Sequence, residues 1–231
     1  MLIINGAGTN GAELKHLYKA LAENENYFVF YPGIMPGVFI GDRFPKSTTK
    51  DFIEFIDSLD ELINAPVFRH VYLIGYSLGA ATAAILAVRN PRIEKLILVA
   101  PIVKNPNYRK FMKGLAESLA LPGHLTRIQQ VFYGEFIRRF IKVPKYHVWH
   151  LQVYLHYTKR YLKMIDKPTM IIETTKDELV SKKSIDQIEK NMQHPVFRRV
   201  PVESSHFLFF DKNVRAMVTK TIEAFLKEEL S

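Results

Sequence analysis

The stretch Gly75-Tyr76-Ser77-Leu78-Gly79 lies between a short apolar run, residues 71–74, and an alanine-rich segment, residues 80–88. A strand, a Gly-x-Ser-x-Gly turn and a helix in this order form the context of a nucleophile elbow. The serine of such a turn has a strained backbone, and the flanking glycines let strand and helix approach each other. The sequence therefore predicts a serine hydroxyl at the carboxyl end of a buried strand, near a helix N-terminus.

The pentapeptide alone is weak support for this interpretation, because chance gives Gly-x-Ser-x-Gly to roughly one chain in fifteen of this length. The alternative is a glycine-rich turn that carries an idle serine. The strand before the turn and the helix after it favour the elbow.

Short apolar runs recur along the chain and alternate with segments in which apolar residues lie three and four positions apart. This alternation is typical of an α/β fold whose parallel strands are buried on both faces. We expect a mostly parallel sheet of about six strands with helices on both faces. The expected strands are residues 2–5, 27–31, 71–74, 95–100, 169–173 and 196–202.

The composition is that of an ordinary globular protein, with 48% hydrophobic and 24% charged residues among 231. The absence of cysteine excludes disulfides, thiolate metal sites and a cysteine nucleophile, and it fits a cytoplasmic location. No run of about 18 apolar residues occurs, so we expect no membrane span. Residues 1–4 lack a basic segment and a full apolar segment, which favours a core strand over a signal peptide.

Residues 101–165 interrupt the alternation of strands and helices. They contain 12 Lys and Arg but 2 acidic residues, whereas the remainder has 20 basic and 21 acidic residues, so the net charge of +9 belongs to this segment. Breaks at 122–123 and 143–144 separate runs of helical spacing. We predict a helical cap, residues 101–165, inserted into a core of residues 1–100 and 166–231. No nucleic-acid-binding motif accompanies the charge, so we expect no nucleic-acid partner.

A serine hydroxyl becomes a useful nucleophile when a base, usually a histidine oriented by a carboxylate, takes its proton. In an elbow fold the acid and then the histidine follow the serine, at the carboxyl ends of later strands. Asp177 lies just after the strand expected at 169–173, with Glu178 as its neighbour and competitor, whereas Asp166 lies at the wrong end of that strand. The alternative for Asp177 is a solvated acid in a charged loop.

His206 follows the last expected strand and precedes the closing helical segment. The other seven histidines precede Ser77, lie within residues 101–165, or come before the last strand. Position therefore favours His206 as the base, and the alternative is a histidine in a surface loop.

The oxyanion of a tetrahedral intermediate needs two backbone N–H donors, one after the nucleophile and one in the loop after the first strand. These are Leu78 and Ala7, the latter flanked by glycines. The alternative for residues 6–11 is a dinucleotide-binding turn, because they match G-x-G-x-x-G. No acidic residue ends the second expected strand, where a ribose-binding acid belongs, so we expect no cofactor.

With these residues in place, nearly the whole chain resembles the α/β-hydrolase family of serine esterases and lipases. Residues 75–79 match its elbow, while residues 168–180 and 205–207 resemble its acid and histidine segments. The resemblance implies a catalytic triad of Ser77, Asp177 and His206.

The chain departs from the family at three places. Residues 5–6 are Asn-Gly where the family often has His-Gly, and Thr174 stands where a glycine is common. Met1 opens on the equivalent of the third strand of larger members, which indicates a minimal core with a helical cap at residues 101–165. None of these departures removes a chemical group that the mechanism needs.

The expected cap contains Trp149, the single tryptophan, and many other aromatic residues. One interpretation is a pocket for an acyl or aromatic group, lined by Tyr76 and Trp149 under a basic lid. The other is that the aromatic residues pack the helices while Lys and Arg face water. The charge favours anionic substrates or a peripheral membrane contact. His147 and His150 have a metal-ligand spacing, but acids and cysteines are missing nearby, so we expect no metal.

We therefore predict a serine hydrolase without a cofactor that cleaves a small carboxylic ester through an acyl-enzyme. The alternatives are thioester hydrolysis, amide hydrolysis or acyl transfer on the same triad, and a non-catalytic ligand-binding member of the fold. No oligomeric state is indicated.

Overall fold

The structure is a computed structural model, and it describes residues 1–6, 11–24, 27–32, 35–36, 45–103, 134, 138, 142–177, 179–192 and 194–229. Within these ranges five parallel strands form one sheet, in the order β1-β2-β3-β4-β5. Their bounds are Leu2–Ile4, Val71–Tyr76, Ile93–Val99, Thr169–Thr174 and Phe197–Val202. Strands β1 to β4 are almost entirely buried, as expected where helices cover both faces.

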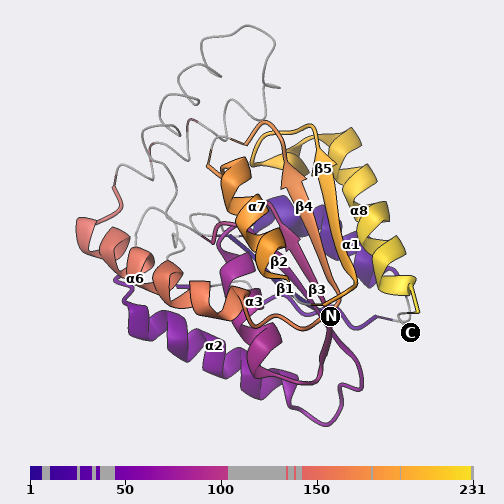
Figure 1. Ribbon diagram of the computed structural model, residues 1–231, viewed down its shortest axis with the longest axis horizontal. Helices are drawn as coiled ribbons and strands as arrows, with labels where there is room; N and C mark the ends of the chain where they lie inside the picture. The colour runs from indigo at the N-terminus through magenta and orange to yellow at the C-terminus, as the bar shows by residue number, and fades with distance from the viewer. Residues whose placement is uncertain are drawn as a thin grey trace, which may run out of the picture.

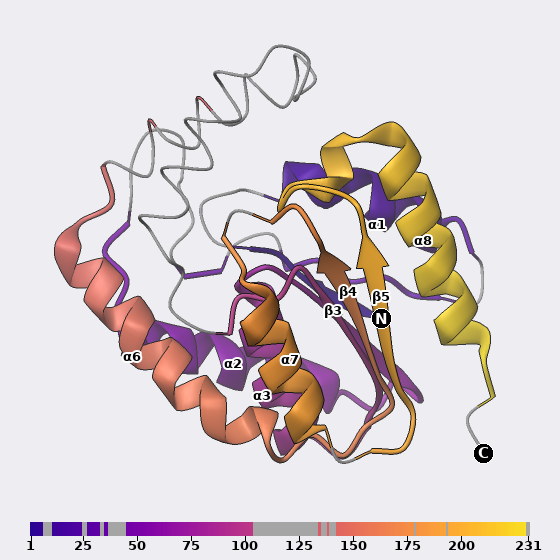
Figure 2. The same cartoon turned by 45° about the horizontal axis from the view of Figure 1, so that its top comes forward.

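Helices cover both faces of the sheet, as Figures 1 and 2 show. One face carries α2 (Thr49–Ile63), α3 (Gly79–Arg89), α6 (Lys145–Leu162) and α7 (Lys182–Asn191), and the other carries α1 (Lys15–Ala22) and α8 (Lys212–Lys227). Two short 3-10 helices, η1 (Ala12–Leu14) and η2 (Leu208–Phe210), lie in the connections. The α/β architecture expected from the sequence is confirmed, because each face of the sheet buries its own cluster of apolar side chains.

The segment expected as a second strand, residues 27–31, forms an isolated bridge beside β1 instead. Phe30 N donates to the Met1 carbonyl at 2.8 Å, and the Phe30 carbonyl accepts from Ile3 N at 3.0 Å. The next bond of this parallel ladder requires a donor at residue 32, and Pro32 has no N–H group. The part of the chain that the structure describes therefore contains five strands rather than about six.

Much of residues 101–165 lies outside the described residues, but α6 is described and packs against the core. The Tyr154 hydroxyl lies 2.8 Å from Thr82 Oγ1 in α3, and its ring stacks on Phe52 of α2 with centroids 4.6 Å apart. The boundaries of the cap stay a prediction. None of the helices described here combines the length and the apolar character that crossing a lipid bilayer demands.

Lys95 of β3 anchors the C-terminus of α8. Its buried Nζ donates to the carbonyl oxygens of Phe225 at 2.9 Å, Leu226 at 2.9 Å and Glu228 at 2.6 Å. The last carbonyls of a helix have no N–H partner within it, and a cation is favourable at this end of the helix dipole. This one side chain therefore ties α8 to the sheet.

We expect Lys95→Met to lower the free energy of unfolding by about 1.5–3 kcal/mol, because the helix carbonyls lose a charged donor. Urea unfolding measures the loss. Lys220→Met, on the exposed side of α8, is the matched control and should change stability by less than about 0.5 kcal/mol. Equal stability of Lys95→Met and the wild type would refute the anchor.

Candidate active site

Ser77 occupies the turn between β2 and α3 with a φ angle of 55°, a left-handed conformation that non-glycine residues rarely adopt. Two glycines make this turn sterically possible. A Cβ at Gly75 would lie 2.6 Å from Ala80 Cα, and one at Gly79 would collide with the carbonyl oxygen of Ile4 at the end of β1. The glycine spacing around the serine is therefore a requirement of the turn itself.

Three side chains form a chain of hydrogen bonds at the carboxyl ends of β2, β4 and β5. Ser77 Oγ lies 2.9 Å from His206 Nε2, and His206 Nδ1 lies 2.8 Å from Asp177 Oδ2. His206 is 1% exposed and Ser77 6%. Because an ionised carboxylate only accepts hydrogen bonds, Nδ1 carries the proton and Nε2 can accept that of the serine hydroxyl. The structure thus brings together the three residues that the sequence singled out.

The carboxylate of Asp177 is buried but well supplied with donors. Oδ1 accepts the backbone N–H groups of Leu179 at 2.8 Å and Val180 at 2.7 Å, and Oδ2 accepts the hydroxyl of Thr174 as well as His206. Burial by itself would raise the pKa of Asp177, but the charge of His206 and these hydrogen bonds outweigh it and hold the pKa below its ordinary value. The carboxylate therefore stays ionised at neutral pH and can stabilise an imidazolium.

Thr174 and Tyr76 support the acid and the base through contacts that sequence reasoning missed. Thr174, the last residue of β4, donates its hydroxyl to Asp177 Oδ2. Tyr76 donates its hydroxyl to the His206 carbonyl at 3.1 Å, and its ring stacks on the imidazole with centroids 5.8 Å apart. At 1% exposure, Tyr76 has little surface for a substrate. The structure favours a role in holding the His206 loop, and its pocket role stays a prediction.

Of the two expected oxyanion donors, Leu78 and Ala7, only Leu78 lies among the described residues. Leu78 directly precedes α3, and the first N–H groups of a helix have no partner within it. A Cβ at Gly6 would lie 2.7 Å from Ser77 Cβ, so the chain just after β1 closely approaches the serine. Ala7, the second expected donor, and Glu178, the alternative acid, lie outside the described residues. The oxyanion donors stay a prediction.

Trp149 and two histidines lie on α6. Trp149 is 59% exposed and its ring contacts that of His150, so its part in a pocket stays a prediction. His150 Nδ1 accepts the Thr49 N–H at 3.1 Å, and His147 Nδ1 lies 3.2 Å from the Ser47 carbonyl. These contacts attach α6 to the start of α2. In the described ranges no three His, Cys, Asp or Glu side chains gather as metal ligands would.

A comparison with models of known protein families gives a match over nearly the whole chain. The model of the Alpha/beta hydrolase family matches residues 1–219. None of the curated proteins matches the chain in sequence.

Solved structures of several hydrolases are similar to the chain. A monoacylglycerol lipase from Paleococcus ferrophilus has 15% identity and a TM-score of 0.66, covering 97% of this chain and 92% of that one. An enol-lactonase from Burkholderia xenovorans LB400 has 16% identity and a TM-score of 0.67, with coverages of 98% and 90%. A meta-cleavage product hydrolase from Pseudomonas fluorescens IP01 has 14% identity and a TM-score of 0.69, with coverages of 97% and 89%. At these identities the likeness shows the fold alone.

We expect Thr174→Val to weaken the hold on Asp177, because a hydrogen bond to a charged group contributes about 1.5–3 kcal/mol. A carboxyl whose pKa is lowered in the folded protein stabilises the fold at every pH above its ordinary pKa of about 3.9. This stabilisation is lost as the pH falls through the pKa of the folded state. The variant should therefore be less stable than the wild type at neutral pH, and the difference should shrink below about pH 4.

Thermal unfolding over this pH range measures the difference. Thr175→Val is the matched control, because the Thr175 hydroxyl lies 3.3 Å from the Val202 carbonyl and does not bind the acid. A stability difference for Thr174→Val that is the same in acid and at neutral pH would show that this residue does not act through the carboxylate.

Proposed function

Since the chain belongs to the Alpha/beta hydrolase family, we propose that it is a serine hydrolase that cleaves a carboxylic ester of a small molecule. The observation that carries this proposal is the buried hydrogen-bonded chain from Ser77 through His206 to Asp177. The lipase and the lactonase among the similar structures are compatible with an ester substrate. The fold alone does not select the bond that is cleaved.

In the proposed reaction His206 Nε2 takes the proton of Ser77 as Oγ attacks the ester carbonyl. Asp177 fixes the tautomer of the imidazole and stabilises the imidazolium. The backbone N–H groups of Leu78 and Ala7 are the proposed donors to the oxyanion. His206 then gives its proton to the leaving alcohol while the acyl group stays on Ser77. Water, deprotonated by the same histidine, attacks the acyl carbon. The bond from this carbon to Ser77 Oγ then breaks, His206 returns the proton to Oγ, and the acid is released.

Other reactions suit the same constellation. Thioester hydrolysis, amide hydrolysis and acyl transfer differ from ester hydrolysis in the leaving group or the acceptor. Rates on an ester, a thioester and an amide of the same acyl group, with and without an added acceptor alcohol, distinguish these reactions. The proposed reaction needs no cofactor. We also propose that residues 101–165 form a cap over a core of residues 1–100 and 166–231, and that the protein is cytoplasmic.

We expect Ser77→Ala to fold normally and to lose about 10⁴–10⁶ in kcat on an activated short-chain ester, because the nucleophile is missing. A fluorophosphonate probe should label the wild type and leave this variant unlabelled. Ser58→Ala, whose wild-type hydroxyl is exposed and donates to the Phe55 carbonyl, is the control that should retain labelling.

Two results would contradict this assignment. More than a tenth of the wild-type activity in Ser77→Ala would exclude Ser77 as the nucleophile. A wild type that shows neither labelling nor turnover would favour a non-catalytic member of the fold.

We expect Asp177→Asn to lower kcat by about 10⁴, because an amide that donates to Nδ1 presents the wrong imidazole tautomer to the serine. Glu178→Gln should have little effect. Steady-state kinetics on the same ester compares the two variants. If the effects came out reversed, Glu178 would be the acid.

A further inference from the structure

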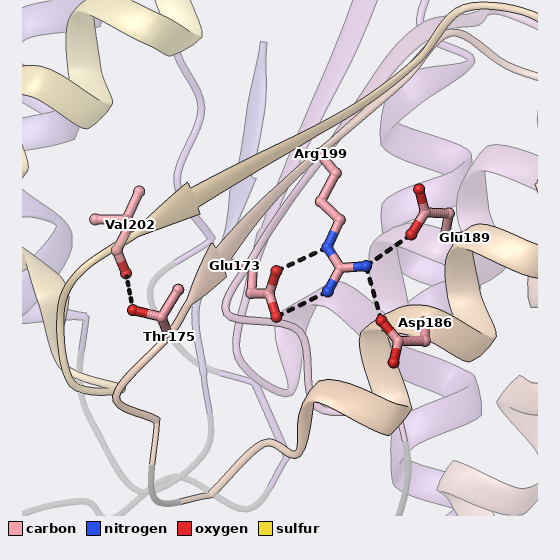
Figure 3. A network of polar contacts seen from close by, with 6 residues as sticks. All are labelled: Glu173, Thr175, Asp186, Glu189, Arg199 and Val202. Carbon is pink, nitrogen blue, oxygen red and sulfur yellow. Dashed lines mark hydrogen bonds and ion pairs between the residues drawn. The ribbon is translucent and has the colours of Figure 1, made fainter.

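One arginine and three carboxylates form a cluster of ion pairs (Figure 3). None of the four belongs to the chain of hydrogen bonds from Ser77 to Asp177. Arg199 of β5 binds Glu173 of β4 twice, with Nε to Oε2 at 2.7 Å and Nη2 to Oε1 at 2.9 Å. Its Nη1 binds Asp186 at 2.8 Å and Glu189 at 2.7 Å, both on α7. One guanidinium therefore ties two strands and a helix together.

The central pair of this cluster is shielded from solvent. The side chains of Arg199 and Glu173 are 19% and 10% exposed, whereas those of Asp186 and Glu189 are about half exposed. The planar fork of a guanidinium matches a carboxylate through two parallel bonds, which fix direction as well as distance. The cluster therefore constrains geometry more than an ordinary surface ion pair does.

The cluster brackets the loop that carries Asp177. Glu173 is the last but one residue of β4, before this loop, and Asp186 lies on α7, after it. Between them, Leu179 and Val180 donate their N–H groups to Asp177 Oδ1. A shift of α7 away from β4 would move the donors that hold the carboxylate in place.

The strand that carries the guanidinium also leads to His206. At the end of β5, Thr175 N donates to the carbonyl of its last residue, Val202, at 2.9 Å, and beyond both strands Lys176 N donates to the Ser204 carbonyl at 3.1 Å. Figure 3 shows the contact of Thr175 and Val202 as a separate pair, on the side of the cluster toward which the strands run. The loops of the acid and the base thus leave the sheet as a paired unit, just after the strand positions that the arginine joins.

We propose that Arg199 is a positioning residue, which keeps Asp177 in line with His206 by holding β4, β5 and α7 together. This inference rests on the proposed function, because it concerns the acid of the proposed triad, but its test does not require turnover. The competing explanation is an ion-pair cluster that only stabilises the fold. Alignment matters for rate, because a displacement of about 1 Å can cost on the order of 10²-fold.

The first test is an NMR titration of labelled histidines in Arg199→Met. The two explanations change the pKa of His206 in opposite directions. Loss of a nearby positive charge alone would raise the pKa of the imidazole, whereas loss of alignment with the carboxylate of Asp177 would lower it. We expect the pKa of His206 to fall in the variant, and a rise would overturn the proposal.

Two further variants make this titration decisive. Arg199→Met leaves the shielded Glu173 without its partner, which can prevent this variant from folding. Arg199→Met/Glu173→Gln removes both charges and replaces the single variant in that case. It should also lower the pKa of His206. Arg198→Met is the matched control. Arg198 neighbours Arg199 in β5 but pairs with Glu228 after α8, so its replacement should leave the His206 pKa unchanged.

The second test compares rates in two backgrounds. With Asp177 present, we expect Arg199→Met to lower kcat by about tenfold to a hundredfold. In Asp177→Asn the same change should cost less than about twofold, because no carboxylate remains to be aligned. An equal fold-loss in both backgrounds would overturn the role of Arg199. Absence of turnover and labelling in the wild type would overturn the proposed function instead, and the histidine titration would still decide on alignment.

Discussion

The contact between the start of α3 and the end of β1 determines the geometry at the carboxyl edge of the sheet. A side chain at Gly79 would collide with the Ile4 carbonyl oxygen, so the helix begins directly against the first strand. This leaves the chain no room for a relaxed turn, and Ser77 has a φ angle of 55°. Such strain, of order 1–3 kcal/mol, persists when the surrounding packing fixes the backbone. The serine is therefore positioned by backbone contacts before any substrate binds.

The acid and the base form a second unit, built by the paired loops after β4 and β5. An ionised, buried carboxylate is costly unless it is fully hydrogen-bonded. Asp177 meets this condition with donors from the end of β4, from its own loop and from His206. Tyr76 joins the two units, because it directly precedes Ser77 and donates to the His206 carbonyl. The geometry at the serine thus depends on how the two units dock.

The order of residues along the chain was the main basis for predicting the acid and the base, because parallel strands bring the loops at their carboxyl ends to one edge of a sheet. This restricted the candidate acid and base to few positions, Asp177 and His206 among them. Periodicity failed for residues 27–31, since their pairing depends on the missing N–H group of Pro32 in register with β1. That register exists only in the folded sheet.

Lys95 and Arg199 show why other interactions escaped sequence reasoning. Each is a charged residue in a strand of a largely apolar sheet. Such a residue indicates a special role, but the sequence does not indicate which group it binds. Lys95 binds a carbonyl 130 residues away, and Arg199 binds Glu173 at a separation of 26 residues. Contacts at such separations follow from the packing of whole elements, which the sequence predicts only in outline.

The hydrogen-bonded chain from Ser77 to Asp177 consists of core residues, with donors from the loops after β2, β4 and β5. In the described segment 142–165, α6 instead contacts the core through Tyr154 and α3. The proposed proton transfer involves Ser77, His206 and Asp177 and sets no requirement on the rest of the substrate, which other parts of the chain would have to select. This separation gives a physical reason why similar folds include a lipase, a lactonase and a meta-cleavage product hydrolase. The arrangement of Ser77, His206 and Asp177 consequently argues for a type of reaction more strongly than for a substrate.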